Sequence, residues 1–412
     1  MTNPILIRTA QLALIAIAAT YSVMILIPLF SAGGFRPDFA VFWTAGRMID
    51  THPAQLYDVQ AITAAQGWLT SPENGLRPFA YPPTALLLFR PFAALPFPAA
   101  FALWTALSIG VFAAAARGLV DRVPLVLSFI APPIVLALAT GQTSMLVAAA
   151  IMAAILALET RPVLAGVLLG LATALKPQAI ILAPLALLAA QQGRALLVWG
   201  STGAVLVAAS ILCWGTQLWV DWLSSLSGFS AIVSSLALDA EGVTPLSFAK
   251  SAGLSGWAML AIQMSAIIAG CVIVIWAFRP REPGEQCSTV LLRRQEPSPD
   301  KNASLRDTLL KVWIPACAGT QLHPIDGTLG RTDPVVRLVA LTAGSLLCAP
   351  YALMYDLAVL MPIAASLLLA GRATGLLAGL AFTGIAGVGA LPAMIAGTLT
   401  ATRQPRTGTP DQ

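Results

Sequence analysis

Residues 255–278 read SGWAMLAIQMSAIIAGCVIVIWAF and are apolar on every face. A helix of this length rises about 1.5 Å per residue and spans the roughly 30 Å hydrocarbon core of a bilayer. Residues 375–399 form a similar run. A strand of an outer-membrane barrel would instead alternate apolar and polar side chains over about ten residues. These stretches therefore predict transmembrane helices and exclude a barrel.

The composition of the whole chain supports the same fold class. Of its 412 residues, 58% are hydrophobic and only 10% are charged, so a water-facing globule could not be covered with polar side chains. The net charge of +5 comes mostly from basic residues that stand singly at the ends of apolar runs, which indicates membrane topology and not nucleic-acid binding. Including 255–278, the sequence predicts an all-α polytopic membrane protein of about eleven transmembrane helices, near residues 9–30, 97–116, 123–140, 143–158, 162–175, 178–191, 195–214, 335–348, 352–370 and 374–399.

The first of these runs, 9–30, is longer than the apolar core of a signal peptide, which favours a retained span. Alternate junctions between the spans carry arginines, and the positive-inside rule makes those junctions cytoplasmic. These arginines are Arg117 and Arg122, Arg161, Arg194, Arg279 and Arg281, and Arg372. The loop 31–96 then lies outside, and its proline-flanked stretch 84–92 predicts a re-entrant or interfacial helix. The same external side is predicted for residues 141–142, 176–178, 215–254 and 349–351. The unusual polar residues therefore converge on one external face.

Residues 279–333 differ from the rest of the chain. They carry eight of the 23 basic and seven of the 18 acidic residues, which predicts a hydrophilic cytoplasmic loop between the membrane domain 1–278 and the C-terminal transmembrane helices 334–400. The stretch 291–319 resembles the translated product of a bacterial intergenic repeat, which indicates a passenger insertion; a regulatory loop is the alternative. Residues 401–412 are expected to form a polar tail.

Metal binding is not indicated. The five cysteines form no C-x-x-C pair, and the two histidines, His52 and His323, lie in dissimilar segments far apart in sequence. We therefore expect neither a metal nor another cofactor.

Asp38 is the first candidate for chemistry. It lies in FRPDFAVFWTAG, residues 35–46, a few residues beyond the predicted membrane exit. The aromatic neighbours can lower the local dielectric and raise the pKa of this carboxyl toward the range of a general base. The alternative is an interfacial aspartate paired with Arg36.

Lys176 is the only lysine among the first 249 residues, and Pro177 after it can begin a new helix. An ammonium beside the free N–H groups of a helix N-terminus suits a phosphate. The alternative is a snorkelling lysine at a helix end.

Five further polar side chains lie at predicted external helix ends. Asp356, which follows Tyr351 and Tyr355, is the only acidic residue between Asp333 and Asp411. An ionisable group within a span is a functional candidate, and an ion pair with a neighbouring helix is the alternative. Gln142 and Gln178 could bind sugar hydroxyls or simply be solvated.

Several motifs occur in a fixed order along most of residues 30–365, apart from 279–333. They are Pro37-Asp38-Phe39-x-x-Phe42-Trp43-x-Ala45-Gly46, Leu56-Tyr57-Asp58, Phe79-x-Tyr81-Pro82-Pro83, Pro91-x-x-x-Leu95-Pro96, Trp104, Gly141-Gln142, Leu175-Lys176-Pro177-Gln178 and Ala349-Pro350-Tyr351-x-x-x-Tyr355-Asp356-Leu357. This pattern resembles glycosyltransferase family 87, which includes polyprenol-phosphate-mannose-dependent mannosyltransferases of mycobacterial lipoglycans.

The resemblance implies a GT-C fold in the plasma (inner) membrane, with an active site that faces outside and is built partly from the first external loop. It implies a polyprenyl-phosphate sugar donor, a lipid or glycan acceptor and Asp38 as the base. Lys176 would bind the donor phosphate, and the substrate-binding candidates are Tyr81, Gln142, Gln178, Tyr351, Tyr355 and Asp356. GT-C enzymes often carry a pair of acidic residues at the position of the catalytic base, whereas Pro37 and Phe39 flank Asp38 here. The single carboxylate argues against a metal-bridged mechanism.

A single carboxylate suffices for transfer of a hexose by one inverting displacement, because polyprenyl phosphate is already a good leaving group. The resemblance to family 87 implies that the hexose is mannose. The main alternative is a secondary transporter or lipid flippase. No inverted repeat is evident, and the polar residues gather at one face and not near the midplane, both of which argue against transport. A non-catalytic scaffold is a third interpretation.

Overall fold

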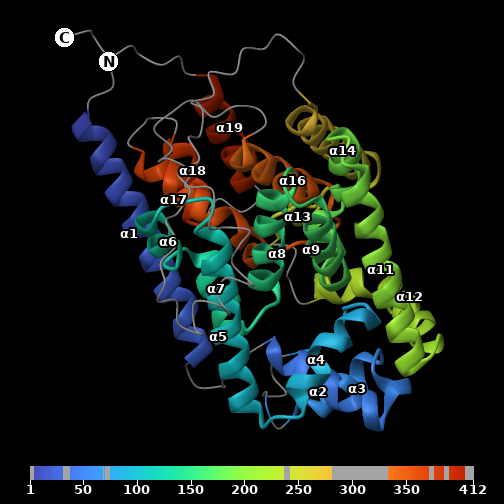
Figure 1. The fold of residues 1–412 in the computed structure, drawn as a ribbon. Helices are drawn as coiled ribbons and strands as arrows, with labels where there is room; N and C mark the ends of the chain where they lie inside the picture. Colours follow the sequence, from blue (N-terminus) through green and yellow to red (C-terminus); the bar gives the residue numbers. More distant parts are fainter. Residues whose placement is uncertain are drawn as a thin grey trace, which may run out of the picture.

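The computed structural model describes residues 4–30, 38–67, 69, 75–235, 242–280, 333–370, 375–384 and 389–403. Every regular element in these ranges is a helix, and one isolated antiparallel bridge joins Gly242 to Leu353. The predicted all-helical fold class is therefore confirmed (Figure 1).

Four helices are long and apolar enough to cross a bilayer: α1 (Pro4–Phe30), α5 (Phe97–Ala116), α11 (Gly193–Trp214) and α14 (Gly256–Phe278). A fifth span is possible if α6 (Arg122–Ser128) and α7 (Pro132–Thr140) are counted together. These two helices meet at a bend of 60°. The break falls where the Pro132–Pro133 pair begins α7, because a proline ring blocks the helical path of the preceding chain.

The remaining apolar helices are short. They are α8 (Ser144–Ala157), α9 (Pro162–Leu175), the 3₁₀ turn η4 (Pro177–Ile180) with α10 (Ala183–Ala189), α16 (Pro334–Cys348), and the 3₁₀ helix η6 (Met354–Leu360) with α17 (Met361–Leu369). A helix of 14 residues, such as α8 or α9, rises only about 21 Å, less than the hydrocarbon thickness. The expected count of eleven spans is therefore not confirmed within the described residues.

Two sequence-based expectations are wrong. The run 374–399 is not one helix, because α18 (Gly375–Phe382) ends before Gly384, whose φ of +69° leaves the helical region, and α19 (Ala390–Arg403) follows. The region 215–254 is not a simple loop, because it contains α12 (Gln217–Ser235) and α13 (Pro245–Ser251). Asp221 and several serines make α12 too polar to stand out as a span, although they are compatible with a helix.

The segment between α1 and α5 folds into a small helical layer. It contains α2 (Phe39–Thr51), the 3₁₀ turn η1 (Pro53–Gln55), α3 (Val59–Ala65), the 3₁₀ turn η3 (Pro83–Ala85) and α4 (Leu86–Ala93), which lie together at the bottom of Figure 1, beside the lower end of α5. An aromatic cluster holds the layer to α5: Phe42 stacks on Phe89 with ring centroids 4.5 Å apart, and Phe39 lies 5.3 Å from Trp104. The helix predicted over 84–92 is thus present as η3 and α4, whereas α2 and α3 were not predicted.

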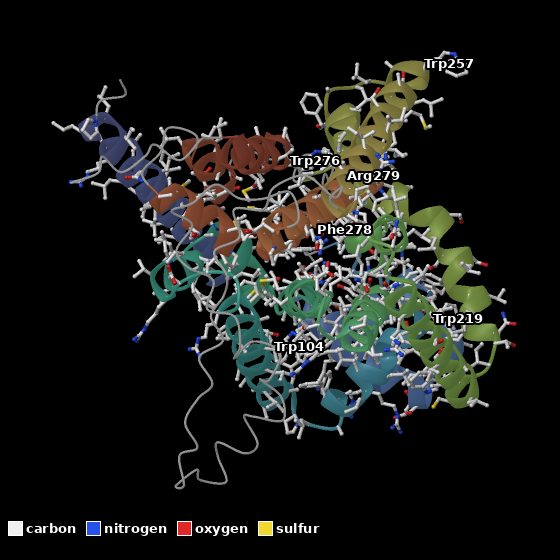
Figure 2. The ribbon with its side chains drawn as sticks, turned by 45° about the horizontal axis from the view of Figure 1, so that its top comes forward. Trp104, Trp219, Trp257, Trp276, Phe278 and Arg279 are labelled. Carbon is white, nitrogen blue, oxygen red and sulfur yellow. The ribbon has the colours of Figure 1, made fainter. Side chains whose placement is uncertain are left out.

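Tight helix packing forms the rest of the core. At the crossing of α14 and α16, a Cβ on Gly270 would lie 2.6 Å from the carbonyl oxygen of Gly344, so only glycine permits this approach. Figure 2 shows the difference between the inside and the outside of the bundle: Trp104 lies within it, whereas Trp257 projects from the end of α14 and is 83% exposed. Such exposed apolar side chains suit contact with lipid.

The predicted loop 279–333 lies outside the described residues except for Arg279, Pro280 and Asp333. Asp333 accepts a hydrogen bond from the Val335 amide and so caps the first turn of α16. Of the predicted polar tail, residues 401–403 belong to α19 and residues 404–412 are outside the described ranges.

Candidate active site

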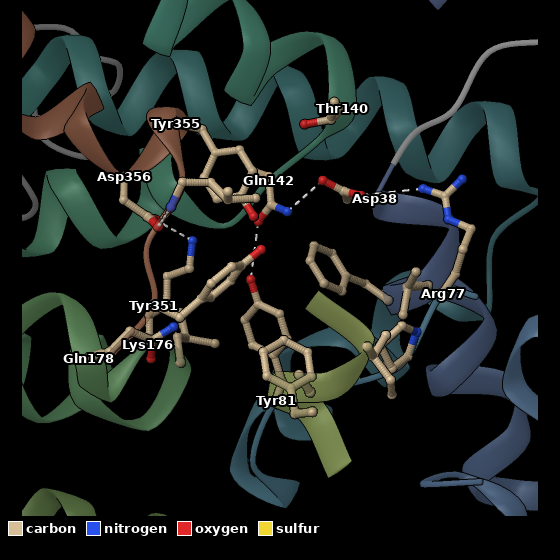
Figure 3. A pocket seen from close by; sticks show the side chains of 18 of the residues that line it. Asp38, Arg77, Tyr81, Thr140, Gln142, Lys176, Gln178, Tyr351, Tyr355 and Asp356 are labelled. Carbon is tan, nitrogen blue, oxygen red and sulfur yellow. Dashed lines mark hydrogen bonds and ion pairs between the residues drawn. The ribbon is translucent and has the colours of Figure 1, made fainter. Parts of the chain in front are cut away.

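A cavity of about 600 Å³ lies where the α2–α4 layer meets the ends of α7, α9 and η6 and one face of α12. The eight site residues singled out in the sequence all line it: Asp38, Tyr81, Gln142, Lys176, Gln178, Tyr351, Tyr355 and Asp356. Figure 3 shows two charged pairs at opposite ends of this cavity, with Gln142 and Tyr81 between them.

The first charged pair is centred on Asp38, which immediately precedes α2. Its Oδ1 lies 3.3 Å from a guanidinium nitrogen of Arg77, and its Oδ2 accepts a hydrogen bond of 2.6 Å from Nε2 of Gln142. The Asp38 side chain is 33% exposed, so a substrate hydroxyl can reach it. The pairing considered with Arg36 concerns a residue outside the described ranges, and the observed cation is Arg77.

The second charged pair is deeply buried. Lys176 ends α9, and its Nζ lies 2.5 Å from Oδ1 of Asp356 and 2.9 Å from Oγ of Ser144. The same ammonium sits 4.5 Å from the ring centroid of Tyr355. Because Lys176 is only 4% exposed, the snorkelling interpretation is wrong. The ion pair considered as the alternative for Asp356 is present, and Lys176 is its partner.

Asp356 is also held by the backbone. Its Oδ2 accepts a hydrogen bond of 3.1 Å from the Leu353 amide at the start of η6. Its Oδ1 accepts from Oγ of Ser144 at 3.0 Å as well as from Lys176. With these partners and a side chain only 5% exposed, Asp356 is less suited than Asp38 to remove a proton from a substrate.

Tyr81 lies between the two charged pairs. Its hydroxyl donates to Oε1 of Gln142 at 3.1 Å and shares a hydrogen bond of 2.9 Å with Oγ1 of Thr143. Burial raises the pKa of Tyr81 well above its ordinary value, since the phenolate would lose its hydration. Tyr81 therefore remains a neutral hydrogen-bond donor and does not serve as a base.

Gly141 sets the position of Gln142. It ends α7 with φ +69°, and a Cβ there would lie 2.7 Å from both Phe39 and Phe101. Only glycine fits this left-handed turn against the aromatic layer. Gln142 is 5% exposed, so the solvated interpretation is wrong for this glutamine; Gln178 is partly exposed at the cavity wall.

Sequence reasoning missed several residues of the cavity. Arg77 gave no signal of its own, although it stands two positions before the Phe79-x-Tyr81 motif. Ser144, which contacts the lining residues Lys176 and Asp356 without lining the cavity itself, gave no signal of its own. The face of α12 that carries Trp222, Leu226 and Phe229 was missed because the helix itself was not predicted.

No group of three or more His, Cys, Asp or Glu side chains in the described part of the chain is arranged to hold a metal ion. Asp38 and Asp356, the two carboxylates among the residues that line the cavity, each have a basic partner. A reaction without metal stays a prediction.

The sequence pattern of glycosyltransferase family 87 matches residues 79–293, about half of the chain. The chain belongs to glycosyltransferase family 87. The matched range includes Tyr81, Gln142, Lys176 and Gln178, and it ends before η6. No curated protein and no solved structure showed significant similarity to the chain.

Membership of family 87, together with the four or five membrane-capable helices, makes this chain a membrane glycosyltransferase. The family favours glycosyl transfer over the transporter and flippase interpretations. The cavity holds a reachable carboxylate at one end, a buried ammonium at the other, and hydrogen-bonding side chains between them.

Proposed function

We propose that the protein transfers a hexose, which we expect to be mannose, from a polyprenyl-phosphate donor to a lipid or glycan acceptor. One observation carries the proposal: Asp38 and Lys176 lie at opposite ends of a single cavity. The carboxylate suits an acceptor hydroxyl, and the ammonium suits a phosphate. The sugar ring would lie between them, beside Gln142 and Tyr81.

The reaction is a single displacement. Asp38 takes the proton of the acceptor hydroxyl while the acceptor oxygen forms a bond to the anomeric carbon. The bond from that carbon to the phosphate oxygen breaks on the opposite face, and polyprenyl phosphate leaves with the bonding electrons. The leaving phosphate gains negative charge, which Lys176 stabilises. The anomeric configuration is inverted, so a β-linked donor gives an α-linked product.

A lipid-linked donor agrees with the walls of the cavity. Trp222, Leu226 and Phe229 lie on one face of α12, because residues four and three apart share a helix face, and all three line the cavity. Val41, Phe42 and Leu175 add further apolar wall. A soluble nucleotide sugar would need polar partners for its base and ribose, whereas this wall suits a prenyl chain.

The donor class is tested with purified protein in lipid, using a panel of polyprenyl-phosphate sugars beside nucleotide sugars. We expect acceptor-dependent release of polyprenyl phosphate, fastest with the mannose donor. Transfer from nucleotide sugars alone would contradict the lipid-phosphate donor while leaving the family intact.

We further propose a GT-C-like arrangement in the plasma (inner) membrane, with the cavity facing outside. A cysteine at Ala64, an exposed position on α3, should react with an impermeant thiol reagent in intact cells. A cysteine at Ser298 should react only after permeabilisation. Both variants are made in a chain without its native cysteines, and labelling of both from the same side would contradict the orientation.

A further inference from the structure

One short segment touches both charged pairs. The turn Gly141–Ser144 joins α7 to α8, and three consecutive side chains from it contact residues that line the cavity. Gln142 donates to Asp38, Thr143 shares a hydrogen bond with Tyr81, and Ser144 lies within hydrogen-bond distance of both Lys176 and Asp356. The charged pairs at the two ends of the cavity are therefore hydrogen-bonded to residues only two positions apart in one turn.

The orientation of Gln142 follows from its partners. Oε1 accepts from the hydroxyl of Tyr81, so the amide nitrogen is the atom that faces Oδ2 of Asp38. Tyr81 is fixed in turn by Thr143. Because a carboxylate only accepts hydrogen bonds, an inverted amide would place its oxygen against Asp38 and lose that bond.

Ser144 holds the second pair in the same way. Its hydroxyl donates to Oδ1 of Asp356 and accepts from the ammonium of Lys176. Both charged side chains are only 5% exposed, so water contributes little to their orientation. The hydroxyl of Ser144 and the carboxylate of Asp356 together direct the ammonium of Lys176.

We infer that the turn Gly141–Ser144 positions the two reacting groups relative to each other, with Gln142 orienting Asp38 and Ser144 orienting Lys176. The inference rests on the proposed function, since it assigns the base to one end and the phosphate ligand to the other. Gln142 and Ser144 are then positioning residues. Their loss should affect different steps: Gln142 the proton transfer, and Ser144 the binding of the donor phosphate.

The separate effects on proton transfer and on binding of the donor phosphate are measured in the variants Gln142→Leu and Ser144→Ala. Gln142→Leu should lower kcat about 10- to 100-fold with little change in donor KM, since it removes a hydrogen bond to a charged group. The acid limb of its pH–rate profile should move to higher pH, because that hydrogen bond favours the carboxylate. Gln142→Glu, which keeps the shape but adds a negative charge beside Asp38, should move the limb further.

Ser144→Ala should instead weaken binding of polyprenyl phosphate about 10-fold or more and leave the acid limb in place. Gln11→Leu and Ser128→Ala are the matched controls. Gln11 donates to the Leu368 carbonyl and Ser128 to the Leu125 carbonyl, and neither lines the cavity. Both controls should keep the kinetics of the wild type. Equal effects of Gln142→Leu and Ser144→Ala on kcat and on phosphate binding, or no effect, would overturn the inference.

A measurement without turnover keeps the inference separate from the proposed function. Thermal midpoints of single and double variants should be non-additive for Gln142→Leu with Asp38→Asn and for Ser144→Ala with Asp356→Asn, because these side chains are in contact. Gln142→Leu with Gln11→Leu should be additive. Additive effects in both contact pairs would overturn the inference even if transfer is observed. Absence of transfer by the wild type, with the non-additivity present, would contradict only the proposed function.

Discussion

Asp38→Asn should lower sugar transfer by about 10²- to 10⁴-fold, the usual contribution of a general base. The substitution keeps the size of the side chain but removes its ability to take a proton. Asp38 is also the more reachable of the two carboxylates that line the cavity, since Asp356 is buried against Lys176. The measurement is kcat with saturating donor and acceptor, together with the thermal midpoint of the purified variant.

The matched control is Asp50→Asn. Asp50 lies on the same helix, α2, and also forms an ion pair, 2.8 Å from Arg90, but it is about half exposed and outside the cavity. Its loss should leave transfer within about twofold, because exposed ion pairs contribute little. Near-normal turnover of Asp38→Asn would move the base to Asp356. Asp58 is a poor substitute, since its carboxylate caps α3 through the amides of Gln60 and Ala61.

Lys176→Met should produce the second large effect. Loss of the ammonium removes the cation that stabilises the leaving phosphate, and we expect transfer to fall about 100- to 1000-fold. The same change leaves the carboxylate of Asp356 buried without its charge partner, which typically costs roughly 3–5 kcal/mol of stability. Lys176→Arg should restore charge but only part of the activity, because a planar guanidinium places its N–H groups differently.

The double variant Lys176→Met with Asp356→Asn separates these two effects. It removes the uncompensated charge, so its thermal midpoint should return toward that of the wild type. Its turnover and its affinity for polyprenyl phosphate should remain low if Lys176 binds the donor. If the pair is only structural, activity should recover together with stability, and Lys176 would then have no role in transfer.

Local sequence signals predicted much of the fold. Apolar runs and helix-starting prolines located α5, α9, α14 and α16 to within a few residues. The sequence also contains a signal for the break between α6 and α7, the pair Pro132–Pro133. The continuous apolar run 123–140 nevertheless favoured a single span. The helix α12 was missed because its serines and Asp221 lower its hydropathy, and the contact with the cavity that makes its apolar face useful depends on tertiary structure.

In the candidate site, too, local sequence predicted some features, and others depend on tertiary structure. The residue types of Asp38, Lys176 and Asp356 stood out because ionisable groups are costly near lipid. The ion pairs that these residues form could not be predicted, because the partners are far apart in sequence. Lys176 and Asp356 are 180 positions apart, and Asp38 and Arg77 are 39 positions apart. No periodicity within a segment encodes such contacts. They require the packing of η6 on α8 and of the α2–α4 layer on the bundle.

The most direct test of the central claim follows the anomeric carbon itself. A β-linked polyprenyl-phosphate mannose, labelled with ¹³C at the anomeric carbon, is incubated with purified protein and acceptor in lipid, and product configuration is read by NMR while polyprenyl phosphate release is counted. A single displacement with Asp38 as the base predicts that one polyprenyl phosphate is released for each sugar transferred and that the product is α-linked. The variant Asp38→Asn should show neither the release nor the product. A β-linked product, or no transfer from any polyprenyl-phosphate sugar, would contradict this mechanism.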